Sequence, residues 1–376
     1  MAIHYKLSIP ARINILGNPA DANEGDFATI SAAVDMYARA EIRPADHVRL
    51  MLLNAGHDRD CTCEDVLPVG CTHGSYDDEL CLIKAGIKVL WNYSEEFRQK
   101  YQQQGFDMRF HSEVPRQSGL GGSSLLVLLL LGGMRAFYQL DPHLHNDYVI
   151  SELTQRAEAD ELGIACGFAD RIVPLFGGIA YTDYRGKLHP KPMDEAPYTT
   201  YERLDDWVQE LPLVLGSTGV RHNSGDVHGK MRPRYIKEHD EYVARGGEMP
   251  PMVRWMSSAW ETAWRGKIAL LKRDWTTFGT LMTRNHFLVN EMMNYCGFTD
   301  GAGWANNLFI EAARSHALGA KLTGAGGGGS VFALSSPGHE DELIERWQQI
   351  ASEHQLTDAL IQKIQITRTG LTVEAE

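Results

Sequence analysis

The chain has 376 residues, enough for two domains and one or two substantial hydrophobic cores. Its 43% hydrophobic and 23% charged residues are typical of an ordinary globular protein. The net charge of −13 excludes a general affinity for nucleic acid, so any phosphate site must be built locally from backbone amides, a metal and a few basic side chains.

The first half of the chain alternates predicted strands and helices. Residues 4–17 alternate and are rich in β-formers, which predicts a strand ending near Gly17. Residues 106–114 have the period of a half-buried strand, and the apolar stretch 123–138 suits a buried helix. Asn146 is a candidate cap for a second helix that runs through Leu162. A short helix at 171–176 and a strand at 179–184 follow.

Residues 187–201 are rich in proline and charge, and we place a domain boundary there, which gives predicted domains 1–200 and 201–376. The second half has its own series of predicted elements: a strand at 211–218, helices at 252–273, 275–295 and 303–318, a glycine-rich turn into a strand, a helix at 340–354 and a strand at 361–366. Interleaved strands and helices in both halves indicate an α+β fold rather than a helical bundle.

No signal peptide or membrane span is predicted. The N-terminus lacks a basic segment followed by a long apolar core, and the longest apolar run, 125–131, is far shorter than the roughly 20 residues that cross a bilayer. We expect a cytoplasmic protein with no membrane partner. The six cysteines fit reduced thiols in that compartment. Some of them cluster with a histidine in a spacing that matches no common zinc pattern, so a metal there is left open beside ordinary thiols: Cys61, Cys63, Cys71, His73 and Cys81.

The segment "SGLGGSSLLV" (residues 118–127) is a candidate phosphate loop. It lacks the lysine of a P-loop, and Ser124 stands where a dinucleotide fingerprint needs a third glycine. The later segment "TGAGGGGSVFAL" has that glycine spacing, but it runs into a strand rather than a helix, so the match is false. What remains is a strand, a glycine-rich loop and a helix N-terminus bearing Ser123 and Ser124. This arrangement suits an anion and Mg²⁺, or else is a tight turn with serine caps.

A third segment, "CGFADRIVPLFGG" (residues 166–178), places Asp170 and Arg171 where a glycine-containing loop enters a helix. Glu158 and Glu161 lie one turn apart on the preceding predicted helix. These are candidate catalytic and metal-binding groups. A surface ion pair and a solvated helix face are the alternatives.

Three segments in this order and spacing resemble the GHMP kinases, the superfamily of galactokinase, homoserine kinase and mevalonate kinase. They are "PARINILGNPAD" (10–21), "PRQSGLGGSS" (115–124) and "KLTGAGGGGSVF" (321–332). Within the superfamily the chain is most similar to plant-type glucuronokinases. Galactokinases have Glu-His where this chain has Asn18-Pro19. The segment "STGVRHNSGDVH" (217–228) is longer and more basic than in glucuronokinases, which leaves the exact sugar open.

The resemblance implies a two-domain α+β GHMP kinase fold with an active-site cleft between the domains, and ATP and Mg²⁺ as cofactors. Seven residues would cradle the ATP phosphates: Pro115, Gly119, Leu120, Gly121, Gly122, Ser123 and Ser124. Ser124 and Glu158 would hold Mg²⁺, with Ser123 as the alternative to Ser124 and Glu161 as the alternative to Glu158.

The resemblance also implies an acceptor side. Asp170 would lie beside the acceptor hydroxyl and either take its proton or stabilise the attacking oxygen, while Arg12 would pair with Asp170 and favour its charged form. The full set of implied substrate contacts is Asn18, Asp21, Asp170, Arg116, Arg221, Gly324, Gly326 and Gly327.

The implied reaction is ATP-dependent phosphorylation of a sugar at its anomeric hydroxyl, with glucuronate as the expected substrate. We expect Arg116 or Arg221 to bind the carboxylate, since an arginine fork matches that group; the alternative for Arg221 is a loop residue that touches only phosphate or solvent. The other candidate substrates are galacturonate, galactose, a heptose or a mevalonate-type acid, and a non-catalytic ATP or sugar sensor is the remaining alternative. The partner would be a small sugar, and the protein a monomer or homodimer.

Overall fold

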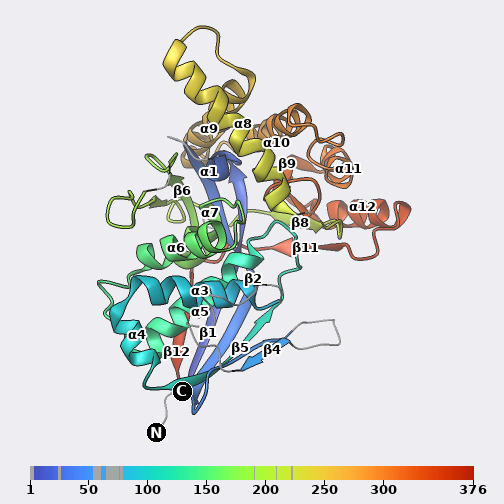
Figure 1. Ribbon diagram of the computed structural model, residues 1–376. Helices are drawn as coiled ribbons and strands as arrows, with labels where there is room; N and C mark the ends of the chain where they lie inside the picture. Colours follow the sequence, from blue (N-terminus) through green and yellow to red (C-terminus); the bar gives the residue numbers. More distant parts are fainter. Residues whose placement is uncertain are drawn as a thin grey trace.

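Two β-sheets organise the computed structural model, which describes residues 4–23, 27–53, 61–64, 76, 79–189, 191–208, 210–221 and 223–376 (Figure 1). Among these residues the large sheet comprises β1 (Tyr5–Leu16), β2 (Ala28–Ala45), β3 (Arg49–Leu53), β4 (Cys61–Glu64), β5 (Gly105–Ser112), β6 (Ile179–Asp183), β7 (Thr200–Arg203) and β12 (Thr372–Ala375). Their spatial order is β12-β1-β2-β5-β3-β4, with β6 paired to β2 and β7 to β6. All these pairings are antiparallel except that of β3 with β5.

The small sheet lies in the second half of the chain. It comprises β8 (Leu213–Ser217), β9 (Ala317–Thr323), β10 (Ser330–Ser335) and β11 (Leu360–Ile364), in the antiparallel order β11-β8-β10-β9. Because β9 and β10 form a hairpin, the glycine-rich residues between them make up its turn. The third sequence motif is therefore a loop at one end of this sheet.

Helices cover both sheets. They are α1 (Ala20–Asn23), α3 (Cys81–Tyr93), α4 (Glu95–Tyr101), α5 (Gly122–Phe137), α6 (Asp147–Arg156), the π-helical turn η1 (Ala157–Glu161), α7 (Ala169–Phe176), α8 (Ser224–Arg245), α9 (Pro251–Leu271), α10 (Trp275–Tyr295), α11 (Trp304–Ala313) and α12 (Glu340–Glu353). In the small sheet, α10 and α11 pack on β9, and α12 packs on β8 and β11. α9 packs on β1 and β2 of the large sheet and also on α10, so it joins the two halves.

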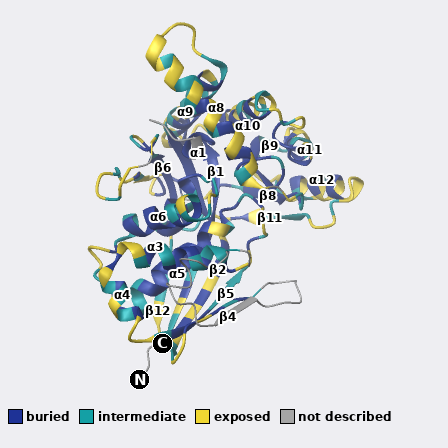
Figure 2. Cartoon of the chain, in the orientation of Figure 1, coloured by how far each residue is buried: buried dark blue, intermediate teal, exposed yellow. Residues whose placement is uncertain are grey.

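α5 is the central helix of the larger core, as its continuous apolar sequence predicts. Every residue from Ser124 to Met134 is buried. A helix that is apolar on all sides must be covered on all sides, and α5 contacts β1 and β2 as well as α3, α6 and α7 (Figure 2). Each fully buried leucine contributes about 1.5–3 kcal/mol to folding. This packing fixes the direction in which the N-terminus of α5 points.

β1 is buried along both faces over most of its length, although its alternating sequence predicts one exposed face. Residues 9–16 are all buried. α5 and α7 pack on this strand, and so do α9 and α10. Because helices from both halves cover β1, polar side chains in its second part lie inside the protein. These include Arg12 and Asn14, which are 2% and 3% exposed.

Most predicted elements are confirmed. The strands at 4–17, 106–114, 179–184 and 211–218 correspond to β1, β5, β6 and β8, and the helices at 123–138, 252–273 and 275–295 to α5, α9 and α10. Asn146 caps α6, as predicted, by accepting hydrogen bonds from Tyr148 and Val149 N–H. The helix predicted at 303–318 is wrong at its end. α11 stops at Ala313 and β9 starts at Ala317, because pairing with β10 overrides the local preference of this segment.

α8 was not predicted from the sequence. This helix of 22 residues buries few side chains: Val227, His228, Met231 and Tyr235. Most of its surface is exposed, so its apolar stripe is too narrow to stand out in the sequence (Figure 2).

Both ends of the chain contribute to the large sheet. β12 pairs with β1, and β7 begins at Thr200, where the predicted domain boundary lies. The division into residues 1–200 and 201–376 stays a prediction. Within the described residues, no helix combines the length and the apolar character needed to cross a membrane.

Candidate active site

The second and third glycine-rich segments lie against each other. A Cβ atom added to Gly119 would lie 2.5 Å from the carbonyl oxygen of Thr323, and one added to Gly324 would lie 2.6 Å from the Cα atom of Gly119. Both glycines also have positive φ angles, 73° and 77°. Since a side chain at either position would clash, only glycine allows the two loops to meet.

α5 begins directly after this contact. Its N-cap residue is Gly121, and no side chain hydrogen-bonds to the cap, so neither serine closes the helix. Ser123 is exposed, whereas Ser124 is fully buried. Leu120 is also buried and its carbonyl accepts a hydrogen bond from Arg12 N–H at 3.2 Å, while Pro115 is half-buried. Uncapped N–H groups and the positive end of the helix dipole suit an anion at this terminus.

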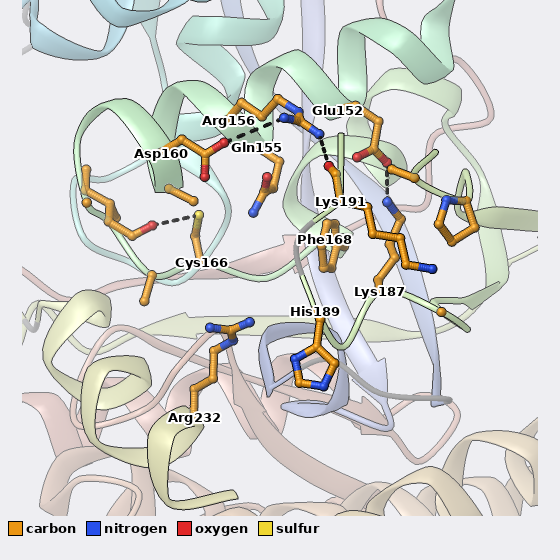
Figure 3. A pocket seen from close by; sticks show the side chains of 17 residues that line it. Glu152, Gln155, Arg156, Asp160, Cys166, Phe168, Lys187, His189, Lys191 and Arg232 are labelled. Carbon is orange, nitrogen blue, oxygen red and sulfur yellow. Dashed lines mark hydrogen bonds and ion pairs between the residues drawn. The ribbon is translucent and has the colours of Figure 1, made fainter. Parts of the chain in front are cut away.

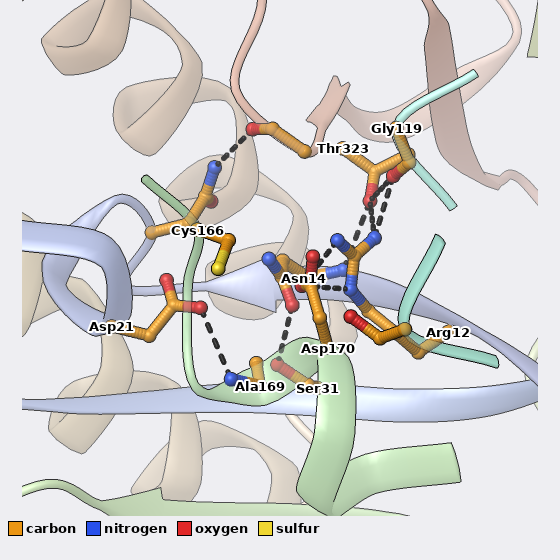
Figure 4. Close-up of polar contacts among 12 residues, drawn as sticks. Arg12, Asn14, Asp21, Ser31, Gly119, Cys166, Ala169, Asp170 and Thr323 are labelled. Atoms are coloured by element: carbon orange, nitrogen blue, oxygen red, sulfur yellow. Dashed lines mark hydrogen bonds and ion pairs between the residues drawn. The ribbon is translucent and has the colours of Figure 1, made fainter. Parts of the chain in front are cut away.

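Arg12 connects this loop to Asp170 (Figure 4). Its Nε donates to Oδ1 of Asp170 at 2.8 Å, and its Nη2 donates to the same oxygen. Its Nη1 donates to the carbonyl of Gly119 at 2.5 Å and to Oγ1 of Thr323 at 3.4 Å. The Arg12 side chain is 3% exposed and that of Asp170 is 17% exposed, so the carboxylate lies at the edge of the buried region. Both bonds from Arg12 use Oδ1, and no hydrogen bond to Oδ2 is found among the described residues.

Asp21 lies beside Asp170. It is buried, and its Oδ2 accepts a hydrogen bond from Ala169 N–H at 3.2 Å, while its carbonyl accepts one from Phe168 N–H at 3.4 Å. A Cβ atom on Gly167 would lie 2.2 Å from Oδ2 of the same carboxylate, so a side chain there would displace Asp21. Burial, and secondarily the charge of Asp170, raises the pKa of Asp21 to about 6.

Asn18 is held by protein groups at both ends of its side chain. Its Nδ2 donates to the carbonyl of Gly324 at 3.4 Å, and its Oδ1 accepts from Nζ of Lys321 at 2.5 Å. Lys321 is fully buried and also donates to the carbonyl of Asn14 at 2.7 Å. Burial lowers the pKa of this lysine well below its usual value. Lys321 begins the third motif in the sequence, but its role there could be seen only once Asn18 was placed beside it.

Other glycines of the third segment make contacts within the protein. Gly327 N–H donates to the carbonyl of Ala302 at 2.8 Å, and a Cβ atom on Gly326 would lie 2.8 Å from the sulfur of Met293. Both glycines therefore have a clear packing role. Direct contact of Gly324, Gly326 and Gly327 with an acceptor stays a prediction.

Ser124, Glu158 and Arg171 form a fully buried polar cluster. Oγ of Ser124 donates to Oε2 of Glu158 at 2.9 Å, and Nη2 of Arg171 donates to the same oxygen at 2.6 Å. All three residues are 0% exposed. Arg171 also donates to the sulfur of Cys166. The sequence left a surface ion pair between Asp170 and Arg171 as the alternative. In the structure Asp170 pairs with Arg12 instead, and Arg171 pairs with Glu158.

The oxygens of this cluster fit a magnesium ion. Hydroxyl and carboxylate oxygens are hard ligands of the kind Mg²⁺ prefers. Oε1 of Glu158 is buried and has no hydrogen-bond partner among the described residues, so this oxygen has a free coordination position. Glu161, the alternative ligand, instead pairs with Lys88 and accepts a hydrogen bond from Tyr76 at 2.8 Å. The geometry thus favours Glu158 over Glu161.

Arg116 and Arg221 are the two arginines predicted to bind the acceptor carboxylate. Among the described residues, neither has a contact that links it to Asp170. Arg116 is half exposed and pairs with Glu79, Nη2 to Oε2, at 3.2 Å. Arg221 is exposed in the loop before α8. Their role stays a prediction. Of the candidate cysteine cluster, Cys71 and His73 and the side chains of Cys61 and Cys63 lie outside what the structure describes, so the cluster stays a prediction; among the described side chains no group of three metal-ligating residues occurs.

Comparison with known families and proteins agrees with this arrangement. Residues 85–178 match the family described as GHMP kinases N terminal domain, and residues 267–352 match GHMP kinases C terminal. A probable glucuronokinase 2 of Arabidopsis thaliana is 31% identical over 340 residues, which cover 89% of this chain and 86% of that protein. A mevalonate kinase of Pyrococcus horikoshii is 24% identical over 100% of this chain and 99% of its own.

The fold is also shared with solved structures. The crystal structure of Lactococcus lactis galactokinase complexed with galactose superposes with a TM-score of 0.75 at 19% identity, covering 98% of this chain and 95% of that one. The predicted α+β fold is thereby confirmed. At this identity the likeness concerns the fold alone.

Proposed function

This chain belongs to the GHMP kinase family, and on that premise we propose that it transfers the γ-phosphoryl group of ATP to the anomeric hydroxyl of glucuronate, giving glucuronate 1-phosphate. The observation that supports this most is the contact of Arg12 with both Asp170 and the carbonyl of Gly119. It ties a partly exposed carboxylate to the candidate phosphate loop. The relative named as a probable glucuronokinase supports a sugar acid as the acceptor.

Phosphoryl transfer requires alignment and charge neutralisation more than covalent chemistry by the protein. In this proposal the ATP phosphates lie against the N-terminus of α5, where uncapped N–H groups and the helix dipole favour negative charge. Asp170 accepts the proton of the attacking hydroxyl through Oδ2. Arg12 holds Oδ1 and so orients the carboxylate.

Ser124 and Glu158 would hold Mg²⁺. When bound, the ion supplies positive charge that neutralises the triphosphate. Arg171 donates to Oε2 of Glu158 and so orients this carboxylate with Oε1 free. Because Ser124 is the third residue of α5, the same helix N-terminus would place both the phosphates and one metal ligand.

A mevalonate-type acid is the second candidate acceptor. It is favoured by the 24% identity to a mevalonate kinase, which extends over the full length of both chains. Both candidates carry a carboxylate. They differ in the hydroxyl that reacts, which is anomeric in the sugar acid and a primary alcohol in mevalonate.

ATP consumption by the purified protein with Mg²⁺ tests the proposal across glucuronate, galacturonate, galactose, glucose, a heptose and mevalonate. We expect turnover on glucuronate, and its loss in Asp170→Ala. Turnover on mevalonate alone would establish the second candidate instead. Turnover on glucuronate that persists in Asp170→Ala would remove Asp170 from the mechanism.

A further inference from the structure

Arg171 is a buried cation of the candidate active site whose hydrogen bonds are incomplete. It is 0% exposed, and its Nη2 atom donates to Oε2 of Glu158 at 2.6 Å and to the sulfur of Cys166. Its Nε and Nη1 atoms are buried and have no hydrogen-bond partner among the described residues. Because buried donors in proteins are almost always hydrogen-bonded, these two atoms indicate a further partner.

The same cluster contains an acceptor without a partner. Oε1 of Glu158 is buried and has no hydrogen bond among the described residues, while its Oε2 accepts from both Arg171 and Ser124. The cluster therefore lacks a cation for one oxygen and an anion for two nitrogen donors. A metal-bound phosphate supplies both, since the metal binds the carboxylate and phosphate oxygens accept from a guanidinium.

The charge of Arg171 suits an anion in this place. Burial alone would lower the pKa of Arg171, but Cys166, Glu158 and Asp170 raise it above its ordinary value. The guanidinium is therefore charged although it lies inside the protein. If Glu158 also binds Mg²⁺, its single negative charge no longer balances the cations around it, which favours a negatively charged oxygen beside Arg171.

Arg171 is attached to both parts of the proposed reaction centre. It follows Asp170 in the first turn of α7, and its guanidinium is bonded to Glu158 on η1. In the proposed reaction, the phosphoryl group passes between the metal site of Glu158 and the hydroxyl beside Asp170. The guanidinium of Arg171 is therefore placed next to the path of that group.

A neighbouring cavity does not account for the free donors. This cavity of about 260 Å³ borders η1 and the loop 163–168, and Cys166 lines it (Figure 3). Arg171 is not among the described residues that line it. A ligand confined to this cavity would therefore meet Cys166 rather than Nε or Nη1 of Arg171.

We propose that Arg171 donates a hydrogen bond, through Nη1 or Nε, to the phosphoryl group that is transferred from ATP. The inference rests on the proposed function and makes Arg171 a catalytic residue as well as a support for Glu158. In the transfer step, the acceptor oxygen bonds to the γ-phosphorus and gives its proton to Asp170. The bond from this phosphorus to the bridging oxygen breaks, and ADP leaves with that electron pair.

The guanidinium acts in this step by neutralising negative charge on the oxygens of the transferred group. Because Nη2 is bonded to Glu158, the side chain is already held in place and needs no reorganisation when the reaction begins.

Arg171→Lys tests this inference. Lysine keeps a positive charge beside Glu158, but its compact ammonium group lacks the spread of donors needed to bond to Glu158 and the phosphoryl group together. We expect kcat at saturating Mg²⁺ to fall about 10²- to 10³-fold. Calorimetry without acceptor should show the Kd of adenylyl imidodiphosphate with Mg²⁺ rising about three- to tenfold. The Kd of ADP with Mg²⁺ should stay unchanged, because ADP lacks the group that Arg171 contacts.

A role limited to orienting Glu158 predicts a different result. Arg171→Lys would then raise the Mg²⁺ requirement and weaken ADP and the analogue alike, and saturating Mg²⁺ would restore kcat. That outcome would overturn the inference. Arg135→Lys is the matched control at the other end of α5. Nη1 of Arg135 donates to Oδ1 of Asp147 at 2.7 Å and to the carbonyl of His145 at 3.0 Å, so this variant should keep all the wild-type constants.

A crystal structure of the wild-type protein with Mg²⁺ and adenylyl imidodiphosphate tests the contact without relying on a variant that must fold. We expect Nη1 or Nε of Arg171 at about 2.7–3.2 Å from an oxygen of the terminal phosphoryl group. A terminal phosphoryl group bound beyond the reach of both atoms would contradict the inference.

The acceptor panel separates this inference from the proposed function. If mevalonate is phosphorylated instead of glucuronate, and Arg171→Lys lowers that turnover as described, the inference holds and the proposed acceptor is wrong. If glucuronate is phosphorylated and Arg171→Lys keeps the wild-type kcat, the inference alone is wrong. A wild-type protein that binds neither ADP nor the analogue would overturn both.

Discussion

The two sides of the candidate active site are built from different chemical groups. The side assigned to ATP is made of backbone, and Gly119 in it is packed so closely against Thr323 that a methyl group there would clash. The side assigned to the acceptor is made of charged side chains held by one another, such as Arg12 with Asp170. Backbone N–H groups accommodate phosphate without adding net charge, whereas a proton transfer needs a group that titrates. This difference explains how an acidic chain can bind a polyphosphate.

Arg12 is the residue that belongs to both sides. It bonds to the carboxylate of Asp170 and also to the carbonyl of Gly119. Substitutions at Arg12 should therefore change the kinetics with both ATP and the acceptor, whereas substitutions on one side of the site should change the kinetics with one substrate only.

The largest effect on both substrates together is expected from Arg12→Lys. Lysine keeps the charge but loses the planar fork that holds Oδ1 of Asp170, so kcat should fall by about 10²- to 10³-fold and the KM for ATP should rise as well. Arg43→Lys is the control, since Arg43 also places Nε and Nη2 on one carboxylate oxygen, that of Asp107, away from the site. Steady-state kinetics with both substrates measure the effect. Equal kinetics for the two variants would contradict the role of Arg12.

Asp21→Asn should change how stability depends on pH. Burial raises the pKa of Asp21 from 3.8 to about 6, so the folded protein holds this proton more tightly than the unfolded chain. Wild-type stability should therefore fall as pH rises from about 4 to about 6, while asparagine does not titrate. About two pKa units correspond to about 3 kcal/mol in favour of the variant above pH 6. Denaturant unfolding from pH 4 to 8 measures this difference, and a pH-independent difference would contradict it.

Glu158→Gln should raise the Mg²⁺ concentration needed for half-maximal activity by about 10- to 100-fold, because a charged ligand becomes neutral at constant shape. Glu161→Gln is the control. Glu161 is held by Lys88 and Tyr76 instead, so this variant should keep the wild-type Mg²⁺ dependence. If Glu161→Gln shifts the dependence and Glu158→Gln does not, the ligand assignment is reversed.

The smallest effect is expected from Gly119→Ala. Its Cβ atom would lie 2.5 Å from the carbonyl of Thr323, so the loop must move, at a cost of about 1–3 kcal/mol. We expect the KM for ATP to rise about five- to tenfold with the acceptor KM unchanged. Gly338→Ala has a similar positive φ, 83° against 73°, and open space around it. Gly338→Ala therefore has the backbone strain without the clash, and only Gly119→Ala should raise the KM for ATP.

The local elements and the order of the motifs could be predicted from the sequence. Asn146 as a cap and the apolar run of α5 have local signals, and these predictions hold. The end of α11 was predicted wrongly, because the pairing of β9 with β10 determines where this helix stops. α8 was missed, because its buried apolar stripe is narrow. Local sequence signals thus identify the helices and strands, and tertiary contacts determine where each one begins and ends.

Candidate site residues could be named from the sequence, but their partners could not. Arg171 follows Asp170 in the chain, yet it pairs with Glu158, because neighbouring residues at the start of α7 point to different sides. Lys321 stands in a recognised motif, but its bond to Asn18 joins β9 to the turn after β1, two segments far apart in sequence.

The division of labour between the two sides is tested most directly with Asp170→Asn, by measuring the Kd for ATP and the turnover of glucuronate on the same preparation. We predict a Kd for ATP within about twofold of the wild type and a loss of turnover of about 10²- to 10⁴-fold, because only the acceptor side has lost its base. Turnover near the wild-type rate, or a loss of ATP binding as large as the loss of turnover, would contradict the assignment of Asp170 to the acceptor.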